Sequence, residues 1–263
     1  MSRPAAPVRA ARSAYLRRHA TLVRWLPRRL LPADWVVAPP DFVGIGAQRS
    51  GTTWWYSLVI AHPGVHHLPV SPKERNFFVQ PIYEPHATEQ VEAYRRIFPR
   101  PRGLLSGEWT PEYMLELGTP ALLHRAVPEA RLLVLLRDPV DRFRSAKQRT
   151  ARETTLAFER GFYWRQLERV LAHFDRDQLL VLQYERCCDD PKEELVRTYA
   201  FLGLDPGFVP EGLRQPVNAA RSPKPSLPPS LVDELRRAYQ PDAAALADAF
   251  PSLDLGLWRT LAG

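Results

Sequence analysis

Cysteine is nearly absent from this chain. Of 263 residues only two are cysteine, and they are adjacent at Cys187 and Cys188. Neighbouring cysteines are poorly placed to bond to each other, and no cysteine spacing typical of a zinc site occurs. A fold held together by disulfides or zinc is therefore excluded, and we predict that the protein binds no metal. A reducing, cytoplasmic location is the simplest expectation.

Long hydrophobic runs are absent as well. No stretch approaches the roughly 20 apolar residues that a membrane-spanning helix needs, and no apolar run of about 7–15 residues follows the Arg-rich N-terminus, so we expect no signal peptide. We interpret residues 1–35 as a basic extension and residues 36–263 as one domain. Residues 13–31 can form a basic helix that either packs on the core, which we favour, or makes peripheral membrane contact.

Lysine is also scarce. The chain has 36 Lys and Arg residues against 29 Asp and Glu, a formal net charge of +7, yet only four of the cations are lysine. We attribute most of this arginine bias to genome composition. The planar guanidinium nevertheless suits phosphate and sulfate, and the net charge favours an anionic ligand. A noncatalytic nucleic-acid-binding module is the alternative interpretation of the charge; we predict no nucleic-acid partner.

One stretch, Asp41 to Trp55, has the pattern of a strand, a glycine turn and the start of a helix. Such a turn directs backbone N–H groups and the positive end of a helix dipole at one point, which favours an anion. Gly46 and Gly51 have the spacing of a nucleoside-triphosphate loop, but Thr52 stands where that loop has lysine. The cation of the turn is Arg49. The turn is therefore typical of a phosphate site, but it lacks the lysine that is typical of an ATP site.

Strand and helix patterns alternate along the rest of the chain. Residues 131–136 and 178–184 are apolar runs of the kind that parallel sheets bury on both faces. The sequence therefore predicts an α/β, P-loop-like three-layer fold with a central, mainly parallel sheet flanked by helices. We also expect a strand over 65–70 and a final helix over 231–250 that Pro241 interrupts. Polar residues follow several of the expected strands and should converge at one sheet edge: Gln48 to Thr53, Glu74, Glu108 and Arg137.

Four stretches together resemble one enzyme family. They are Gly46–Thr53, Lys73–Phe78, Arg137–Arg142 with Ser145, and a late basic loop containing Arg221 and Lys224. In order and spacing they are similar to the sulfotransferases that use 3′-phosphoadenosine-5′-phosphosulfate (PAPS), above all to the carbohydrate branch that includes heparan sulfate N- and O-sulfotransferases. The resemblance implies transfer of a sulfuryl group to a hydroxyl, or less readily an amine, of a carbohydrate, glycolipid or natural product.

The resemblance also implies a set of PAPS-binding residues. The first turn would hold the 5′-phosphosulfate through Gln48, Arg49, Ser50, Gly51, Thr52 and Thr53. Arg137 and Ser145 match the family's signature for the 3′-phosphate, although Arg137 has an ion pair with Asp141 as its alternative role. Arg221 and Lys224 would close over the adenosine.

For catalysis, the resemblance implies that Glu74 is the general base and that Arg49 and Lys73 supply positive charge. A positioned carboxylate can take the proton of an attacking hydroxyl. The family usually has lysine where this chain has Arg49, and again where it has Trp109. We predict substrate contact for Trp109 and Glu108; the alternative for Trp109 is a core tryptophan.

A P-loop kinase or NTPase is the alternative function. The missing loop lysine and the lack of an Asp at the end of the 131–136 strand both count against it.

Overall fold

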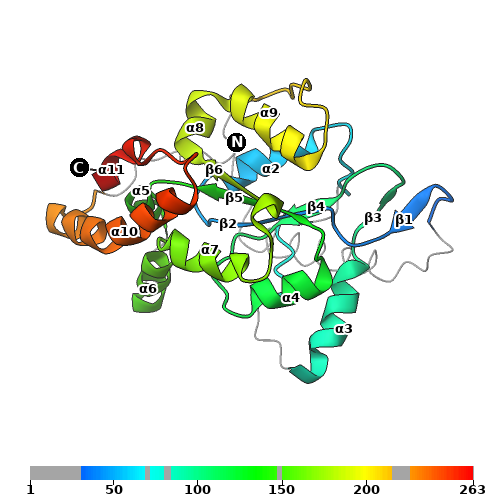
Figure 1. Ribbon diagram of the computed structural model, residues 1–263, viewed down its shortest axis with the longest axis horizontal. Helices are drawn as coiled ribbons and strands as arrows, with labels where there is room; N and C mark the ends of the chain where they lie inside the picture. The colour runs from blue at the N-terminus through cyan, green and yellow to red at the C-terminus, as the bar shows by residue number, and fades with distance from the viewer. Residues whose placement is uncertain (1–30, 69–71, 80–83, 147–149, 215–225, 263) are drawn as a thin grey trace, which may run out of the picture.

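The computed structural model describes residues 31–68, 72–79, 84–146, 150–214 and 226–262. Its centre is a four-stranded sheet in the order β4-β2-β5-β6, and every neighbouring pair in it is parallel (Figure 1). The strands are β2 (Phe42–Gly46), β4 (Gly107–Trp109), β5 (Arg131–Leu136) and β6 (Leu179–Gln183). A separate antiparallel pair joins β1 (Trp35–Val37) to β3 (Pro99–Pro101). The predicted α/β fold with a mainly parallel sheet is confirmed.

Helices cover both faces of this sheet (Figure 1). They are α2 (Thr52–Ile60), α3 (Glu84–Arg95), α4 (Thr119–Ala126), α5 (Pro139–Ser145), α6 (Ala151–Glu159), α7 (Tyr163–Leu171), α8 (Tyr184–Asp189), α9 (Pro191–Leu202), α10 (Pro229–Ala249) and α11 (Arg259–Ala262), with short 3₁₀ turns at Arg176–Gln178 and Leu255–Leu257.

The apolar run of β5 divides its side chains between two cores. Leu132, Val134 and Leu136 belong to the core beneath α3, α4, α7 and α10. Leu133 and Leu135 belong to the core beneath α2 and α9. Successive side chains of a strand point to opposite faces, so a continuous apolar run is what a strand between two helical layers requires. The result is the predicted three-layer arrangement, which aligns the carboxyl ends of the strands along one edge.

Helix caps follow the local sequence closely. Asp138 caps α5, since its carboxylate accepts from the N–H groups of Val140 and Asp141 at 2.9 and 3.2 Å. Pro139 takes the first helical position, where its missing N–H costs nothing. Gly203 ends α9 with a left-handed φ of 69°, a conformation that glycine adopts without strain.

The structure corrects the prediction that Pro241 interrupts the last helix. Helix α10 continues through it to Ala249. Proline in a helix costs about 3 kcal/mol, but two contacts hold the half of α10 that follows Pro241. Leu246 is buried in the core, and the carboxylate of Asp242 accepts from the N–H groups of Trp164 and Arg165 at the start of α7, at 2.8 and 3.0 Å.

Three further expectations need adjustment. Val65 makes only an isolated parallel bridge to Leu105, and the end of the expected 65–70 strand lies outside the described residues. Helix α6 was not expected, because its sequence ARETTLAFE has few apolar residues and only Ala157 in it is buried. Residues 1–30, Arg221 and Lys224 lie outside the described residues, so their predicted roles stay predictions.

Candidate active site

The turn between β2 and α2 forms the base of the site. Gly51 caps α2 with a φ of 88°, and Arg49 also adopts a left-handed φ, of 71°. The first-turn N–H groups of α2 have no partners within the helix and point out of its end. The hydroxyl of Ser50 is fully buried and has no hydrogen-bond partner within the described residues. Together these donors form a cradle for an oxyanion.

Lys73 directs its ammonium at this cradle. Its Nζ donates to the Thr52 hydroxyl at 2.9 Å and to the Thr53 hydroxyl at 3.4 Å, both in the first turn of α2. The Lys73 side chain is only 15% exposed, and burial lowers its pKa below the ordinary value. A half-buried cation at the positive end of a helix is unfavourable by itself, so the arrangement favours an anion that both can contact.

Glu74 lies beside this ammonium. Its Oε1 is 3.2 Å from the Lys73 Nζ, and 46% of its side chain is exposed. The carboxylate is therefore next to the cradle and open to an incoming molecule, as a general base must be.

Arg49 connects the turn to the end of α5. Its Nε donates to the backbone oxygen of Ser145 at 2.8 Å, although the two residues are 96 positions apart. The Ser145 hydroxyl donates to the backbone oxygen of Arg142 at 3.1 Å. Two residues predicted to bind opposite ends of the donor are thus in direct contact across one sheet edge.

Arg137 lies against the ring of Tyr184, which also borders the turn between β2 and α2. Its guanidinium carbon lies 4.8 Å from the centre of the Tyr184 ring, and its Nη2 lies 3.5 Å from the Asp141 carboxylate, so the alternative ion pair also forms. The Arg137 Nε is buried without a partner in the described part of the chain. A Cβ added to Gly51 would lie 2.7 Å from the same ring. The ring of Tyr184 therefore borders both the cradle at Gly51 and the Arg137 guanidinium.

Glu108 is a structural hub in this structure. Its side chain has no exposed surface, and burial raises its pKa. Its carboxylate accepts hydrogen bonds from Thr110 Oγ1 at 2.6 Å, Tyr94 Oη at 2.7 Å, Arg75 N at 2.8 Å and Tyr113 Oη at 2.9 Å. Because Arg75 adjoins Glu74, Glu108 holds the segment that carries the predicted base. The predicted substrate contact does not fit this burial.

Trp109 is likewise a core residue. It is fully buried, its indole N–H donates to the backbone oxygen of Gly46 at 3.1 Å, and a Cβ on Gly44 would fall 2.0 Å from its ring. The Trp109 ring therefore fills the space beside β2 that Gly44 leaves open because it has no side chain. Of the two interpretations of Trp109, the structure favours the core tryptophan over contact with the acceptor.

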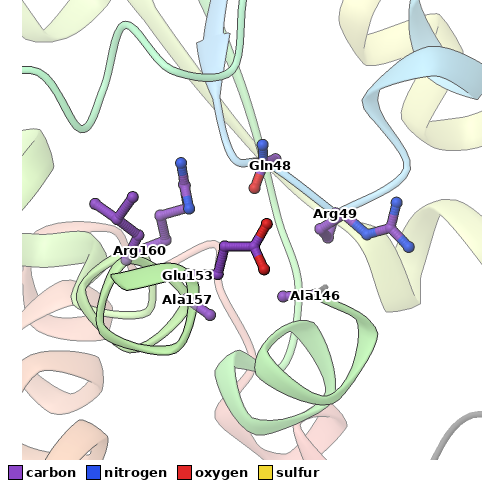
Figure 2. Close-up of a pocket in the computed structure, with 7 residues that line it drawn as sticks. Gln48, Arg49, Ala146, Glu153, Ala157 and Arg160 are labelled. Carbon is purple, nitrogen blue, oxygen red and sulfur yellow. The ribbon is translucent and has the colours of Figure 1, made fainter. Parts of the chain in front are cut away.

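A cavity of about 350 Å³ opens beside the turn (Figure 2). It is lined by Gln48, Arg49, Ala146, Glu153, Leu156, Ala157 and Arg160. The sequence motifs did not indicate the lining residues of α6 or Arg160, which follows that helix. These residues lie about 100 positions from the turn in sequence and match none of the motifs. Glu112, which links Gln48 to Arg160, lies close in sequence to Glu108 and Trp109, for which we predicted substrate contact, and so had a signal.

The described residues hold no candidate metal cluster and no candidate membrane span. Nowhere in those residues do three or more His, Cys, Asp or Glu side chains gather in a way that could hold a metal ion. Within the same ranges, no helix combines the length and apolarity needed to cross a membrane.

The chain is similar to known proteins in sequence. A profile described as "Sulfotransferase family" matches residues 86–208. Over 188 residues the chain is 28% identical to heparan sulfate glucosamine 3-O-sulfotransferase 3B1 of Mus musculus, a match covering 63% of this chain and 46% of that protein. Over 202 residues it is 28% identical to the bifunctional heparan sulfate N-deacetylase/N-sulfotransferase 4 of Mus musculus, covering 64% of this chain and 23% of that protein. The chain thus spans less than half the length of these two relatives.

The fold is similar as well. The crystal structure of a sulfotransferase from Alicyclobacillus acidocaldarius superimposes with a TM-score of 0.66 at 25% identity, covering 85% of this chain and 100% of that one. The sequence and structural matches together confirm the resemblance that the four motifs indicate.

Proposed function

We propose that this protein is a sulfotransferase that moves a sulfuryl group from PAPS to a hydroxyl, or less readily an amine, of a carbohydrate, glycolipid or natural product. The observation that carries the proposal is the position of Lys73, whose ammonium meets the first turn of α2 through Thr52 and Thr53 with the Glu74 carboxylate beside it. An anion cradle, a cation and an exposed carboxylate therefore meet at one point, which is what sulfuryl transfer requires. We also keep the cytoplasmic location as a prediction.

The residues present fit a donor with phosphate at both ends. The buried, unpartnered Ser50 hydroxyl and the open helix terminus suit the 5′-phosphosulfate. Arg137, whose Nε is also without a partner among the described residues, suits the 3′-phosphate, because a guanidinium fork binds phosphate well. Ser145 lies against the turn, since its backbone oxygen accepts from the Arg49 Nε.

In this mechanism PAPS supplies the sulfuryl group, and its phosphate takes the electron pair of the bond that breaks. Glu74 takes the proton from the acceptor hydroxyl, whose oxygen forms the new bond to sulfur. Arg49 and Lys73 stabilise the negative charge that grows on the leaving oxygen. Lys73 can also donate a proton there, whereas an arginine keeps its proton at neutral pH.

Binding of the reaction's nucleotide product is the first test. Adenosine-3′,5′-bisphosphate at 100 times its Kd should stabilise the fold by about 2.7 kcal/mol, measured as a rise in Tm, and ATP at the same concentration should stabilise it less. Transfer of radiolabelled sulfate from PAPS to a panel of acceptors then tests the reaction. Equal stabilisation by ATP, together with no sulfate transfer to any acceptor, would favour the kinase or NTPase alternative.

A further inference from the structure

The segment that carries Lys73 and Glu74 is held by a neighbouring stretch of the chain. Residues 72–79 form neither helix nor strand, so their backbone N–H groups need partners outside a regular ladder. Asn76 adopts a left-handed φ of 51°, and a left-handed residue in a turn can direct successive N–H groups to one side. The acceptors that meet these N–H groups belong to β4 and to the turn that follows it.

Three consecutive N–H groups of this segment are bound to that stretch. They belong to Arg75, Asn76 and Phe77, and their acceptors are Glu108 Oε2 at 2.8 Å, Thr110 Oγ1 at 3.1 Å and Tyr113 Oη at 3.0 Å. On the other side of Glu74, the backbone N–H of Trp109 donates to the backbone oxygen of Lys73 at 3.0 Å. The backbone on both sides of Glu74 is therefore tied to residues 108–113.

The hydroxyls of Thr110 and Tyr113 depend on Glu108 for their direction. A backbone N–H can only donate, so each hydroxyl accepts from the segment and has one proton left to donate. Thr110 donates that proton to Glu108 Oε2 at 2.6 Å, and Tyr113 donates its own to Glu108 Oε1 at 2.9 Å. Glu108 is fully buried in β4, which pairs with β2, the strand that leads to the cradle. The carboxylate thus connects the segment of Glu74 to the central sheet.

We propose that Glu108 is a positioning residue for the transfer reaction. Through Thr110 and Tyr113 it sets the position of Glu74 relative to the cradle. The Glu74 side chain is 46% exposed and its ion pair is with the adjacent Lys73, so the backbone around Glu74 determines where its carboxylate lies. A misplacement of about 1 Å can lower a rate roughly 10²-fold. Glu108→Gln would set an amide N–H against donors in the core, so the test uses the hydroxyls that Glu108 orients.

Two buried tyrosines provide a matched pair of variants. Tyr94 and Tyr113 both donate to Glu108 Oε1, at 2.7 and 2.9 Å, and neither is more than 1% exposed. The Tyr113 hydroxyl also accepts the N–H of Phe77, whereas no N–H of the described segment 72–79 donates to the Tyr94 hydroxyl. We expect Tyr113→Phe to lower kcat about tenfold or more, and Tyr94→Phe to keep kcat within about twofold. KM for PAPS should stay the same in both, because neither variant alters the cradle.

Thr110 provides a second pair. Thr110→Val removes the hydroxyl and nearly keeps the shape of the side chain, whereas Thr110→Ser keeps the hydroxyl and loses the methyl group. We expect kcat to fall about tenfold in Thr110→Val and to stay within about twofold in Thr110→Ser. Transfer of radiolabelled sulfate from PAPS to the best acceptor of the panel measures kcat for all four variants below their Tm. The rise in Tm with adenosine-3′,5′-bisphosphate is the control and should match that of the unmodified protein.

Three results would overturn the inference: equal kcat in Tyr113→Phe and Tyr94→Phe, equal kcat in Thr110→Val and Thr110→Ser, or a loss of bisphosphate binding that matches the loss of kcat. The inference rests on the proposed function, so the unmodified protein is assayed first. Sulfate transfer by the unmodified protein, together with any of the three results, would leave the proposed function standing. If the unmodified protein transfers sulfate to no acceptor of the panel, the proposed function fails and this inference fails with it.

Discussion

The Nε of Arg49 is hydrogen-bonded to the backbone oxygen of Ser145 at 2.8 Å. This contact fixes the side chain that occupies the family's usual lysine position against the end of α5. Lys73, by contrast, donates from its ammonium to two hydroxyls in the first turn of α2 and also contacts Glu74. The positive charge at the turn is therefore divided between the Arg49 guanidinium and the Lys73 ammonium, and experiments can distinguish the contributions of the two.

Lys73→Met should lower kcat by about 10²–10³, the usual effect of removing one donor that stabilises charge in the transition state. Lys192→Met, on the exposed start of α9, is the control and should keep full turnover. Steady-state sulfate transfer measures both. Equal turnover in the two variants would exclude a role for the Lys73 ammonium.

The pH dependence follows from the same ammonium. Burial lowers the pKa of Lys73, and only its protonated form stabilises the leaving phosphate. We expect kcat/KM for PAPS to fall as pH rises through this lowered pKa, at a pH below about 10.4, where an ordinary lysine titrates. In Lys73→Arg that alkaline fall should disappear, since arginine keeps its proton. An identical fall in both proteins would assign it to another group.

Glu74→Gln should remove turnover without affecting donor binding. The amide keeps the size of the side chain but cannot take a proton, so kcat should fall about 10²–10⁴-fold. The rise in Tm with adenosine-3′,5′-bisphosphate should match that of the unmodified protein. Glu211→Gln is the matched control on an exposed turn. Turnover that survives in Glu74→Gln would refute the assignment of the base.

Arg137→Ala should weaken nucleotide binding selectively at the 3′-phosphate. Hydrogen bonds to charged groups contribute about 1.5–3 kcal/mol each, so the Kd for adenosine-3′,5′-bisphosphate should rise about tenfold or more while that for AMP changes little. Isothermal titration calorimetry measures both constants. Arg237→Ala, an exposed arginine of α10, is the control. An equal loss of affinity for both nucleotides would place Arg137 away from the 3′-phosphate.

Gly51→Ala should destabilise the fold more than Gly103→Ala. Both glycines have a left-handed φ, 88° and 83°, but a Cβ at Gly51 lies 2.7 Å from the Tyr184 ring, whereas a Cβ at Gly103 has nothing within 4 Å. The left-handed conformation alone costs roughly 1–2 kcal/mol, which urea unfolding should show for Gly103→Ala. Gly51→Ala should add to that loss and weaken bisphosphate binding, because Tyr184 must move. Equal losses of stability in the two variants would show that the Tyr184 ring can move aside without a cost in free energy.

The local elements were predictable because short-range chemistry sets them. The glycine turn between Phe42 and Thr52, the Asp138 cap and the apolar run of β5 all depend on neighbouring residues. The parallel sheet followed from their alternation. The same reasoning failed at Pro241, where the cost of proline is local but the packing that outweighs it comes from α7 and the core.

The sequence by itself determined which groups could form an anion site: a glycine turn, a helix terminus and cations that follow strands. Only the tertiary structure decided which of them meet. It buried Glu108 and Trp109, for which the resemblance led us to predict substrate contact, with a core tryptophan as the alternative for Trp109. It also brought Gln48, Glu112 and Arg160 together into one hydrogen-bonded wall. These contacts join residues that are 48 and 64 positions apart in sequence. They depend on how the layers of the fold pack together, which cannot be inferred from the spacing of residues along the chain.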